Sequence, residues 1–582
     1  MSHKFFFERN IVTKKPELRW KFLDNENNEK VFELAKTFEI PITIAKILFS
    51  RGITSSEEAQ KFFYSSKDDL HDPFLMKDMD IAVNRVFSAL DKKEKIMIYG
   101  DYDVDGTNGT ALLYLFMQKI GAQVTYYIPD RILEGYGISK TGIDYAKEIN
   151  VSLIISVDCG ITAIEQTNYA HSIGIELIIC DHHQPAENLP EAVAILNPMQ
   201  KDCNYPFKFL CGCGVAFKFI SAISTKLSQP IDVTEYLDFV ALASTADIVP
   251  LIDENRILVK LGLERINNFP RPGIKALIEK AKIKTTSLSS GQVVFNLAPR
   301  INAVGRMGDA MRAVKLLISL EMDEAREYAA VLETENSERK LIDGTVLQTA
   351  IEEAEKAIVN DKANIFVLYN PSWHPGVIGI VASRIVEKYY RPAILLTSIN
   401  GAAKGSARSI SGFNLYDALN QCSHLLDQFG GHKYAAGLSL QIDKIDELRD
   451  SLQQIAKDNL TEEILTPEIT IDAQVEINEL DAKFMQYLKL LAPFGPKNLK
   501  PNFLLKNAPI YGYPKIVGIN HLKFKVKKNG AVIDCIGFNL GEFLNQLMMD
   551  RQNFEIVFSV DEEDFLGITL PQLKIRDIKF SS

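Results

Sequence analysis

One stretch decides the predicted fold: Gly174-Ile175-Glu176-Leu177-Ile178-Ile179-Cys180-Asp181-His182-His183. It opens with a glycine, continues through a short apolar run rich in isoleucine, and ends in a carboxylate and two imidazoles. The apolar run predicts a buried β-strand. The three polar residues are potential metal ligands, although a surface turn would explain the triplet equally well if it stood alone.

The same pattern occurs twice earlier in the chain. A strand predicted over 95–100 is followed by Asp101-Tyr102-Asp103-Val104-Asp105-Gly106, and a strand predicted over 151–157 is followed by Asp158. Another strand is predicted over 123–128. Strands that alternate with helices predict an α/β domain built on a parallel sheet.

The run from Asp101 to Gly106 lies before a helix predicted over 111–120. An Asp-x-Asp-x-Asp-Gly run also opens EF-hand calcium loops, but the twelfth loop position here is Leu112, where a bidentate Glu is required. A strand rather than a helix also precedes the run. A plain solvated turn remains an alternative, but it does not explain why acids recur at three strand ends.

These polar residues are predicted to meet although they are far apart in the sequence. In an open parallel sheet, ligands bind beyond the carboxyl ends of the strands, near a topological switch point. A further acid, Asp247 in Ala243-Ser244-Thr245-Ala246-Asp247-Ile248-Val249-Pro250, ends an apolar segment and could join them. Converging carboxylates repel one another unless a cation neutralises them. Four or five acids with two histidines exceed the needs of one small cation, so the sequence predicts two ions.

Mixed oxygen and imidazole ligands favour Mn²⁺, with Mg²⁺ as the alternative. No matched set of cysteines indicates a structural zinc site. The segment 202–214, with Cys203, Cys211 and Cys213, is better explained as a glycine-rich turn, and zinc binding there is the alternative. Two ions can hold a phosphoryl group, activate water and stabilise the leaving oxygen. The residues therefore predict phosphoester hydrolysis.

Four motifs in order over about 150 residues resemble those of the DHH phosphoesterase superfamily. They are Asp103-x-Asp105-Gly106, Asp158, Asp181-His182-His183 and Asp247. The resemblance implies that the metal ligands are Asp103, Asp105, Asp158, His182 and Asp247. It also implies that His183 is a ligand or a catalytic neighbour, and that Asp101 is a supporting acid or a further ligand.

The segments beyond Asp247 suggest how a phosphate could be bound. The loop 299–308 contributes Asn302 and two arginines, Arg300 and Arg306, whose guanidinium groups suit phosphate. The alternative is an ordinary loop with solvated arginines. Helices rich in Ala, Glu, Leu and Lys follow over about 310–360, with an interruption predicted near Asp343-Gly344. A second α/β unit begins near Asn364. Its glycine-rich turns, 404–409 with Ser406 and Arg408 and 429–433 with Gly431 and His432, resemble the DHHA1 domain, which implies a lobe that covers the active cleft.

A mostly β module follows Pro467. Its segment 521–528 alternates apolar residues with Lys523, Lys525 and Lys527, and Asn529-Gly530 predicts a hairpin turn. The lysine row could follow a phosphate backbone. The alternative is an exposed edge strand protected by lysine. The segment Pro493-Phe494-Gly495 resembles the start of the OB-like domain of RecJ nucleases.

The order of domains resembles the RecJ family as a whole. The predicted fold is α/β, with two α/β lobes joined by long helices and a C-terminal OB-like β domain. The predicted parts are a helical part of the catalytic lobe (1–90), a DHH domain (91–310), connecting helices (311–360), a DHHA1 domain (361–463) and an OB-like domain (464–582). The resemblance implies a two-metal exonuclease of single-stranded DNA with 5′-to-3′ polarity that acts in DNA repair and recombination.

The resemblance also implies how the substrate is held. A single strand would pass between the lobes to the metals, while the OB-like domain holds the strand and a duplex is too wide to enter. Single-strand-binding protein and a RecQ-type helicase are the implied partners. The implied substrate-binding residues are Arg131, Tyr136, Arg300, Asn302, Arg306, Ser406, Arg408, Gly431 and His432.

Composition sets outer limits on these predictions. The chain has 582 residues, a net charge of −10 and seven cysteines. The charge argues against a generally basic nucleic-acid binder but allows a local basic groove. The N-terminus has no signal-peptide core and no apolar run is long enough to span a membrane, so a cytoplasmic location with reduced thiols is expected.

Three other functions are alternatives to the exonuclease. They are a phosphodiesterase of short oligonucleotides or cyclic dinucleotides, a Mn²⁺-dependent pyrophosphatase, and a non-enzymatic scaffold that binds single strands.

Overall fold

The structure of the protein is a computed structural model that describes residues 17–23, 28–283, 287–359, 363–565 and 568–580. The chain divides into two compact units. The smaller unit holds Met1–Phe22 and Ser337–Thr470, and the larger unit holds Leu23–Asn336 and Ile471–Ser582. Among the described residues, every helix is too short or too polar to cross a membrane.

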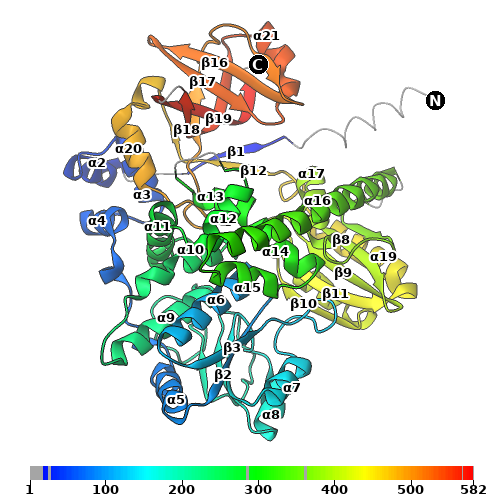
Figure 1. The fold of residues 1–582 in the computed structure, drawn as a ribbon. Coiled ribbons are helices and arrows are strands. Elements are labelled where there is room, and N and C mark those ends of the chain that lie inside the picture. Colours follow the sequence, from blue (N-terminus) through cyan, green and yellow to red (C-terminus); the bar gives the residue numbers. More distant parts are fainter. Residues whose placement is uncertain (1–16, 24–27, 284–286, 360–362, 566–567, 581–582) are drawn as a thin grey trace. The chain divides into compact units, whose positions relative to one another are not determined.

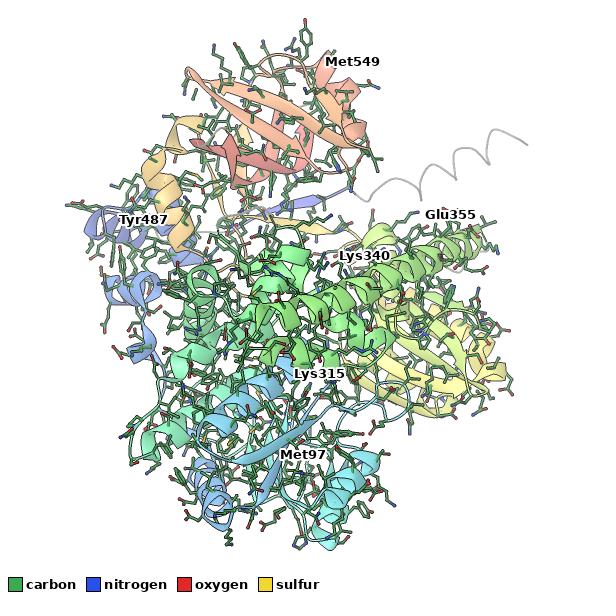
Figure 2. All side chains as sticks on the ribbon, viewed as in Figure 1. Met97, Lys315, Lys340, Glu355, Tyr487 and Met549 are labelled. Carbon is green, nitrogen blue, oxygen red and sulfur yellow. The ribbon has the colours of Figure 1, made fainter. Side chains whose placement is uncertain are left out.

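A five-stranded sheet in the order β3-β2-β4-β5-β6 forms the centre of one part of the larger unit, and all of its strands are parallel (Figure 1). The predicted strands are therefore confirmed. The chain runs from β2 outward to β3 and then crosses to β4 on the other side, so the topological switch point lies between β2 and β4. Met97 on β2 is fully buried within this sheet (Figure 2). The strands are β2 (Lys95–Gly100), β3 (Gln123–Tyr127), β4 (Val151–Val157), β5 (Glu176–Cys180) and β6 (Ala194–Leu196).

Helices pack around this sheet and form its core with it. Leu112 and Phe116 of α6 lie in one buried cluster with Val215 of α9 and Phe239 of α10. We refer to this sheet and its helices as the sheet domain. The helices are α5 (Met79–Lys92), α6 (Val104–Lys119), α7 (Lys140–Glu148), α8 (Ile164–Ser172), α9 (Gly212–Lys226), α10 (Leu237–Ala246), α11 (Asp253–Asn268), α12 (Pro272–Lys280), α13 (Ser290–Gln292), α14 (Ala298–Met307) and α15 (Met311–Ile318).

Helix α6 begins earlier than predicted, at Val104 rather than Ala111. Asp103 is its N-cap residue, because Oδ1 of Asp103 accepts hydrogen bonds from the N–H groups of Asp105 and Gly106. Asp105 therefore lies in the first turn of a helix and not in an open loop. The helix fixes the relative positions of these two carboxylates.

The N-terminal helices α2 (Asn28–Thr37), α3 (Ile42–Ser50) and α4 (Ser56–Tyr64) do not belong to the sheet domain. Their apolar faces, including Ile44 and Phe63, share a core with Phe484 and Phe503 of the C-terminal module. The stretch predicted as one helical part of the catalytic lobe (1–90) therefore packs in two places, because α2–α4 share the core of the C-terminal module and α5 packs on the parallel sheet. The amphipathic pattern predicts that these helices bury one face, but it does not identify the partner.

The C-terminal module is a seven-stranded sheet in the order β13-β14-β18-β19-β17-β16-β15. The predicted hairpin at Asn529-Gly530 is confirmed, and both turn residues have positive φ, at 51° and 86°. Its elements are β13 (Ala473–Gln474), α20 (Ala482–Leu490), β14 (Phe503–Lys506), β15 (Lys515–Val517), β16 (His521–Lys528), β17 (Ala531–Gly537), α21 (Leu544–Met549), β18 (Phe554–Phe565) and β19 (Ile568–Phe580).

The smaller unit contains a second five-stranded sheet, in the order β10-β11-β9-β8-β7. A separate two-stranded sheet pairs β1 (Arg19–Phe22) with β12 (Glu468–Ile471). The elements of this unit's core are β7 (Phe366–Tyr369), α17 (Ile378–Tyr389), β8 (Ala393–Ile399), β9 (Ala402–Arg408), α18 (Leu415–Gln421), β10 (Gln428–His432), β11 (Ala435–Gln441) and α19 (Ile445–Asn459).

The turns predicted at 404–409 and 429–433 are wrong, because β9 and β10 occupy these segments. The small residues fit close packing rather than chain reversal. A Cβ on Gly405 would lie 2.5 Å from Leu396 and 3.0 Å from Leu438, so only glycine leaves room for these neighbours.

The interruption predicted at Asp343-Gly344 is also wrong. Helix α16 (Met322–Val359) runs through it for 38 residues, and the chain leaves helical structure earlier, between Ile318 and Met322. The buried carboxylate of Asp343 lies 2.9 Å from Nη2 of Arg384, so tertiary pairing stabilises a residue type that is otherwise unfavourable inside a helix.

Candidate active site

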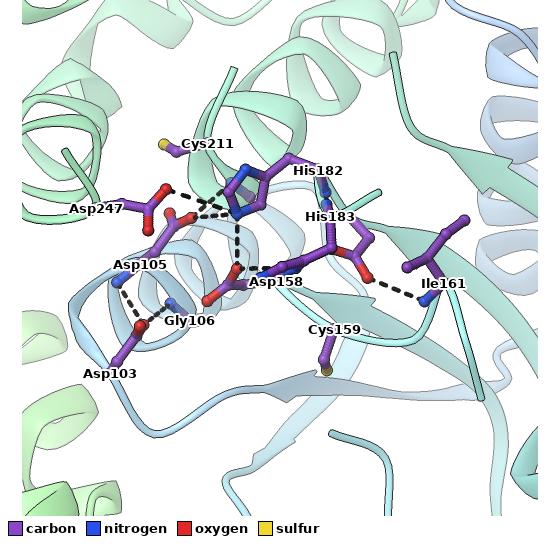
Figure 3. A network of polar contacts seen from close by, with 12 residues as sticks. Asp103, Asp105, Gly106, Asp158, Cys159, Ile161, His182, His183, Cys211 and Asp247 are labelled. Carbon is purple, nitrogen blue, oxygen red and sulfur yellow. Dashed lines mark hydrogen bonds and ion pairs between the residues drawn. The ribbon is translucent and has the colours of Figure 1, made fainter. Parts of the chain in front are cut away.

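The acids predicted to converge do meet at the carboxyl edge of the parallel sheet (Figure 3). Asp101 follows β2, Asp158 follows β4 and Asp181 follows β5, while Asp247 ends helix α10. His182 lies at the centre of the cluster. Its Nε2 atom is 3.2 Å from Asp158 Oδ1, 3.7 Å from Asp105 Oδ2 and 3.7 Å from Asp247 Oδ2.

Three groups of these side chains could each hold a metal ion, because their ligand atoms lie within 4.8 Å of one another. Two of the groups share no residue, which provides positions for two ions. The groups are Asp105 with His182 and Asp247, Asp101 with Asp103 and Asp158, and Asp158 with His182 and His183.

The electrostatics of the cluster fit divalent cations. Burial raises the pKa of Asp105, Asp158 and Asp247, and repulsion between neighbouring carboxylates raises it further. Burial and the charge of Asp103 also hold the pKa of Asp101 well above its usual range. Oδ1 of Asp101 is buried and has no hydrogen-bond partner among the described residues. Oxygen and imidazole donors of this kind suit Mn²⁺ or Mg²⁺.

Asp181 acts on the two histidines and belongs to none of the three groups. Its Oδ1 accepts hydrogen bonds from the backbone N–H groups of His182 and His183, at 2.7 and 3.1 Å, and lies 2.7 Å from Nδ1 of His183. Burial alone would lower the pKa of His183, but its hydrogen bond and ion pair with Asp181 raise this pKa to about 9. Asp181 therefore orients both imidazoles, a role that the sequence did not reveal.

The N-terminus of helix α9 holds Asp105. The N–H groups of Gly212 and Cys213 donate to its two carboxylate oxygens at 2.6 and 2.8 Å. A Cβ on Gly212 would lie 2.7 Å from Cβ of Asp158, so glycine is needed for this close approach. Part of the segment predicted as a glycine-rich turn is thus a helix start that supports a metal ligand.

Zinc binding by the cysteines of this segment gains no support. None of the candidate metal-binding groups among the described residues contains a cysteine. All seven cysteines lie in the described part of the chain, where they are buried and form no disulfide.

Arg131 and Arg306 line one cavity of about 220 Å³ beside the acids, together with Asp130, Ile132, Leu133, Gly305, Met307 and Gly308. The Arg131 guanidinium lies 4.9 Å from the ring centre of Tyr102, a contact that orients the cation. Tyr136 reaches the acids directly, because its hydroxyl donates to the carbonyl of Asp158 at 2.9 Å and lies 3.2 Å from Nδ1 of His183. Tyr102 was not singled out from the sequence.

Arg300 and Asn302 contact protein groups. The segment predicted as a loop is helix α14. Arg300 is buried there, pairs with Glu333 and donates to the carbonyl of Asn296. Oδ1 of Asn302 accepts the N–H of Val104 at 3.2 Å. These contacts favour a supporting role for both residues: Asn302 holds the turn that follows β2, and Arg300 ties α14 to Glu333 of α16.

In the smaller unit, the other predicted substrate-binding residues lie on neighbouring strands. In the register of the sheet, Ala435 on β11 pairs with Arg408 on β9 on one side and with His432 on β10 on the other. Nη1 of Arg408 lies 3.0 Å from Oγ of Ser406. A Cβ on Gly379 would lie 2.8 Å from Oγ of Ser406, which places the first turn of α17 beside that hydroxyl. A cation, a hydroxyl and a helix N-terminus together suit an anion.

Gly431, also on β10, has a positive φ of 141° and lies close to β11. A Cβ there would come 2.4 Å from the carbonyl of Ala435, so the site requires glycine. The structure thus brings Ser406, Arg408, Gly431 and His432 together within this unit.

The lysine row lies on the outer face of β16, opposite buried Leu522, Phe524 and Val526. The strand is not an edge. One side of it pairs with β17, and the other pairs with β15 and with the segment Pro509–Tyr511. Edge protection therefore does not explain the lysines.

Two exposed tyrosines accompany the lysine row. Tyr511 is 51% exposed and Tyr513 is 78% exposed. Nζ of Lys527 lies 5.1 Å from the ring centre of Tyr511, and the Arg551 guanidinium lies 5.4 Å from that of Tyr513. The sequence analysis missed these rings, although paired tyrosines around Gly512 were the available signal.

Three family profiles match successive parts of the chain. Residues 95–244 match the DHH family, N-terminal domain; residues 362–458 match the DHHA1 domain; and residues 471–577 match the RecJ OB domain. The order is the one predicted, and the β module at the C-terminus is an OB domain.

Named relatives match almost the whole chain. The single-stranded-DNA-specific exonuclease RecJ of Bacillus subtilis (strain 168) is 40% identical over 568 residues, which cover 97% of this chain and 71% of that relative. The RecJ of Escherichia coli (strain K12) is 34% identical over 93% of this chain and 96% of its own. The crystal structure of RecJ in complex with Mn²⁺ from Thermus thermophilus has a TM-score of 0.83 and 28% identity, covering 97% of this chain and 80% of that chain. The chain therefore belongs to the RecJ family of single-stranded-DNA-specific exonucleases.

Proposed function

We propose that this protein is a metal-dependent exonuclease that hydrolyses the phosphodiester bonds of single-stranded DNA. The observation that carries the proposal is the convergence of Asp103, Asp105, Asp158, His182 and Asp247 in groups that provide positions for two cations. The RecJ relatives and the RecJ structure with Mn²⁺ support the same reaction. The DHH, DHHA1 and OB regions that we assign are 91–310, 361–463 and 464–582, joined by 311–360.

Two Mn²⁺ or Mg²⁺ ions bound by these ligands would activate the attacking water and neutralise charge on the phosphate. Side chains of the protein supply the other interactions with the phosphate. His183 is half-exposed beside Tyr136, and its hydrogen bond and ion pair with Asp181 raise its pKa, which favours an imidazolium that could donate a hydrogen bond to a phosphoryl oxygen. Asp181 fixes its orientation. Asp101 supports Asp103 and Asp158, with which it forms one of the candidate metal-binding groups.

We assign the terminal nucleotide to the residues whose chemistry suits phosphate. Arg131 and Arg306 line one cavity next to Tyr136, and Ser406, Arg408, Gly431 and His432 cluster in the smaller unit. Arg300 and Asn302 act through contacts within the protein, because Arg300 pairs with Glu333 and Asn302 holds the turn after β2. That cleavage runs from 5′ to 3′ is a proposal that rests on the family.

The OB domain supplies a surface for the rest of the strand. Lys523, Lys525 and Lys527 suit the phosphate backbone, and Tyr511 and Tyr513 suit bases. An aromatic ring can stack on a base only when that base is unpaired, so this surface would favour single strands over duplexes. A role in DNA repair and recombination, a cytoplasmic location, and single-strand-binding protein and a RecQ-type helicase as partners remain predictions from the family.

The test is incubation of the full chain with end-labelled single-stranded DNA, duplex DNA and a dinucleotide, with and without Mn²⁺. Metal-dependent release of mononucleotides from the 5′ end of the single strand alone supports the proposal. Cleavage confined to the dinucleotide would instead indicate a small-substrate phosphodiesterase. Binding of single strands without any cleavage would indicate a scaffold.

A further inference from the structure

The segment Pro493–Asn498 lies against the loop that carries Asp247. The N–H of Leu251 donates to the carbonyl of Pro496 at 2.8 Å, and Oγ of Ser290 donates to the carbonyl of Phe494 at 2.6 Å. A Cβ on Gly495 would lie 2.6 Å from Cδ1 of Leu251, so the glycine backbone packs directly on this side chain. The OB domain thus touches the chain four residues from Asp247.

Buried polar groups hold this segment in place. Nδ2 of Asn498 donates to the carbonyls of Leu491 and Pro493, at 2.9 and 2.7 Å. Gly495 and Asn498 exchange two backbone hydrogen bonds at 3.0 Å. The Arg256 guanidinium on α11 donates to three successive carbonyls, those of residues 490, 491 and 492. A segment fixed by so many interactions can act as a rigid support.

The loop that it contacts has an unfavourable conformation. Ile248, next to Asp247, has a φ of +61°, which is rare for a β-branched residue. The Ile248 side chain is 62% exposed, so its own packing contributes little to offset the strain. Nδ2 of Asn255 donates to the carbonyl of Pro250 at 3.0 Å and so holds the C-terminal end of the loop that begins at Asp247. Strained backbone persists where its surroundings enforce it.

We propose that the segment Pro493–Asn498 is a positioning element of the metal centre. It holds the loop after Asp247 in the strained conformation that directs this carboxylate toward His182 and Asp105. The inference rests on the proposed metal-binding role of Asp247. It goes beyond that role because it makes the OB domain, through the segment Pro493–Asn498, a determinant of metal affinity as well as a surface for DNA.

Gly495→Ala in the full chain tests this proposal, because the added Cβ must displace Leu251. Gly537→Ala is the matched control. Its Cβ would lie 2.9 Å from Cδ1 of Leu540, so it also crowds a leucine of the OB domain, but at a residue outside the loop contact. The measurement is Mn²⁺ binding to the metal-free protein by calorimetry, without DNA. Gly495→Ala should weaken one binding event about 10- to 100-fold, while Gly537→Ala should bind Mn²⁺ like the wild type.

Ser290→Ala removes a single supporting hydrogen bond and should weaken the same binding event by a smaller factor. Thermal unfolding would reveal whether Gly495→Ala folds. If it does not fold, Ser290→Ala is the variant that tests the proposal. Wild-type Mn²⁺ affinity in both variants, or equal weakening by Gly537→Ala, would overturn the proposal. Asp247→Asn tests the metal-binding role of Asp247 separately from the positioning role of Pro493–Asn498. If this variant binds Mn²⁺ like the wild type, Asp247 is not a metal ligand, and the positioning role is then wrong as well.

Discussion

Nε2 of His182 lies 3.2 Å from Oδ1 of Asp158, although the two residues follow different strands of the sheet. The same nitrogen lies 3.7 Å from a carboxylate oxygen of Asp105 and of Asp247. One imidazole therefore faces three acids that repel one another when no cation is bound. Loss of one acid should consequently have opposite effects on the metal-free and the metal-bound protein.

Asp158→Asn should abolish cleavage, with a loss of more than about 100-fold, because even changes outside the ligand shell reduce metal affinity 10- to 100-fold. Asn fits the site, since residue 158 has a φ of +62° and Asn tolerates this region well. Affinity for single-stranded DNA should remain close to that of the wild type. Nuclease assays and fluorescence anisotropy provide the two measurements.

The same variant should be more stable than the wild type when both are metal-free, because it removes repulsion from a buried cluster. We expect its Tm in chelator to rise by roughly 2–4 °C for each kcal/mol gained. Added Mn²⁺ should stabilise the wild type more than the variant. Unchanged turnover, or a metal-free variant that is less stable than the wild type, would refute this description of the cluster.

The stability of the metal-free protein should depend on pH through Asp158 and Asp247. Their pKa values in the folded state lie well above the ordinary value, so the folded state binds more protons than the unfolded state once the pH exceeds about 3.9. Stability from these groups is thus highest at low pH and is lost as the pH rises through their folded pKa values.

The comparison of Asp247→Asn with the wild type isolates this effect from other titrating groups such as His182. In chelator, the loss of Tm between pH 5.5 and pH 7.5 should be smaller in the variant. With saturating Mn²⁺ the contribution should reverse in the wild type, because metal ligands must be deprotonated. Parallel pH profiles of the two metal-free proteins would contradict the proposed repulsion.

Replacing Lys523, Lys525 and Lys527 together by alanine should weaken binding of single-stranded DNA and flatten its salt dependence. Each phosphate contact contributes about 0.7 to the slope of log Kobs against log salt, so three lost contacts should reduce the slope by about 2. Lys92→Ala with Lys93→Ala changes exposed charge at the C-terminal end of helix α5 as a control. A slope equal to that of the wild type would show that the lysine row does not contact DNA.

Tyr513→Ala should cost about 1–3 kcal/mol in affinity for single-stranded DNA, the range found for stacking of one base. Tyr513→Phe keeps the ring and should bind like the wild type. Met549→Ala removes an exposed apolar side chain (89% exposed) elsewhere on the same domain and should have no effect (Figure 2). Equal affinities of the alanine and phenylalanine variants would exclude stacking at residue 513.

Local patterns were sufficient to predict the strand ends that carry Asp101, Asp158 and Asp181, because apolar runs and the polar residues that follow them are adjacent in sequence. Parallel-sheet topology then predicted their convergence. The roles of Asp181 and Gly212 were not predictable, since they consist of hydrogen bonds to residues placed by tertiary packing.

The differences between prediction and structure have the same origin. The sequence pattern of residues 28–64 predicts helices that bury an apolar face. Only the folded chain shows that this face packs on the OB domain. The small residues around Gly405 resemble a turn, yet crowded neighbours on both sides require them in a strand. The contact between Gly495 and Leu251 links residues far apart in the sequence.

Crystals of the full chain grown with Mn²⁺ allow a decisive measurement, an anomalous difference map at the manganese absorption edge. We predict two peaks at the carboxyl edge of the parallel sheet. One should be contacted by Asp105, His182 and Asp247, and the other should lie beside Asp103 and Asp158. A single peak, or peaks bound only by other residues, would contradict the two-ion centre on which the proposed hydrolysis depends.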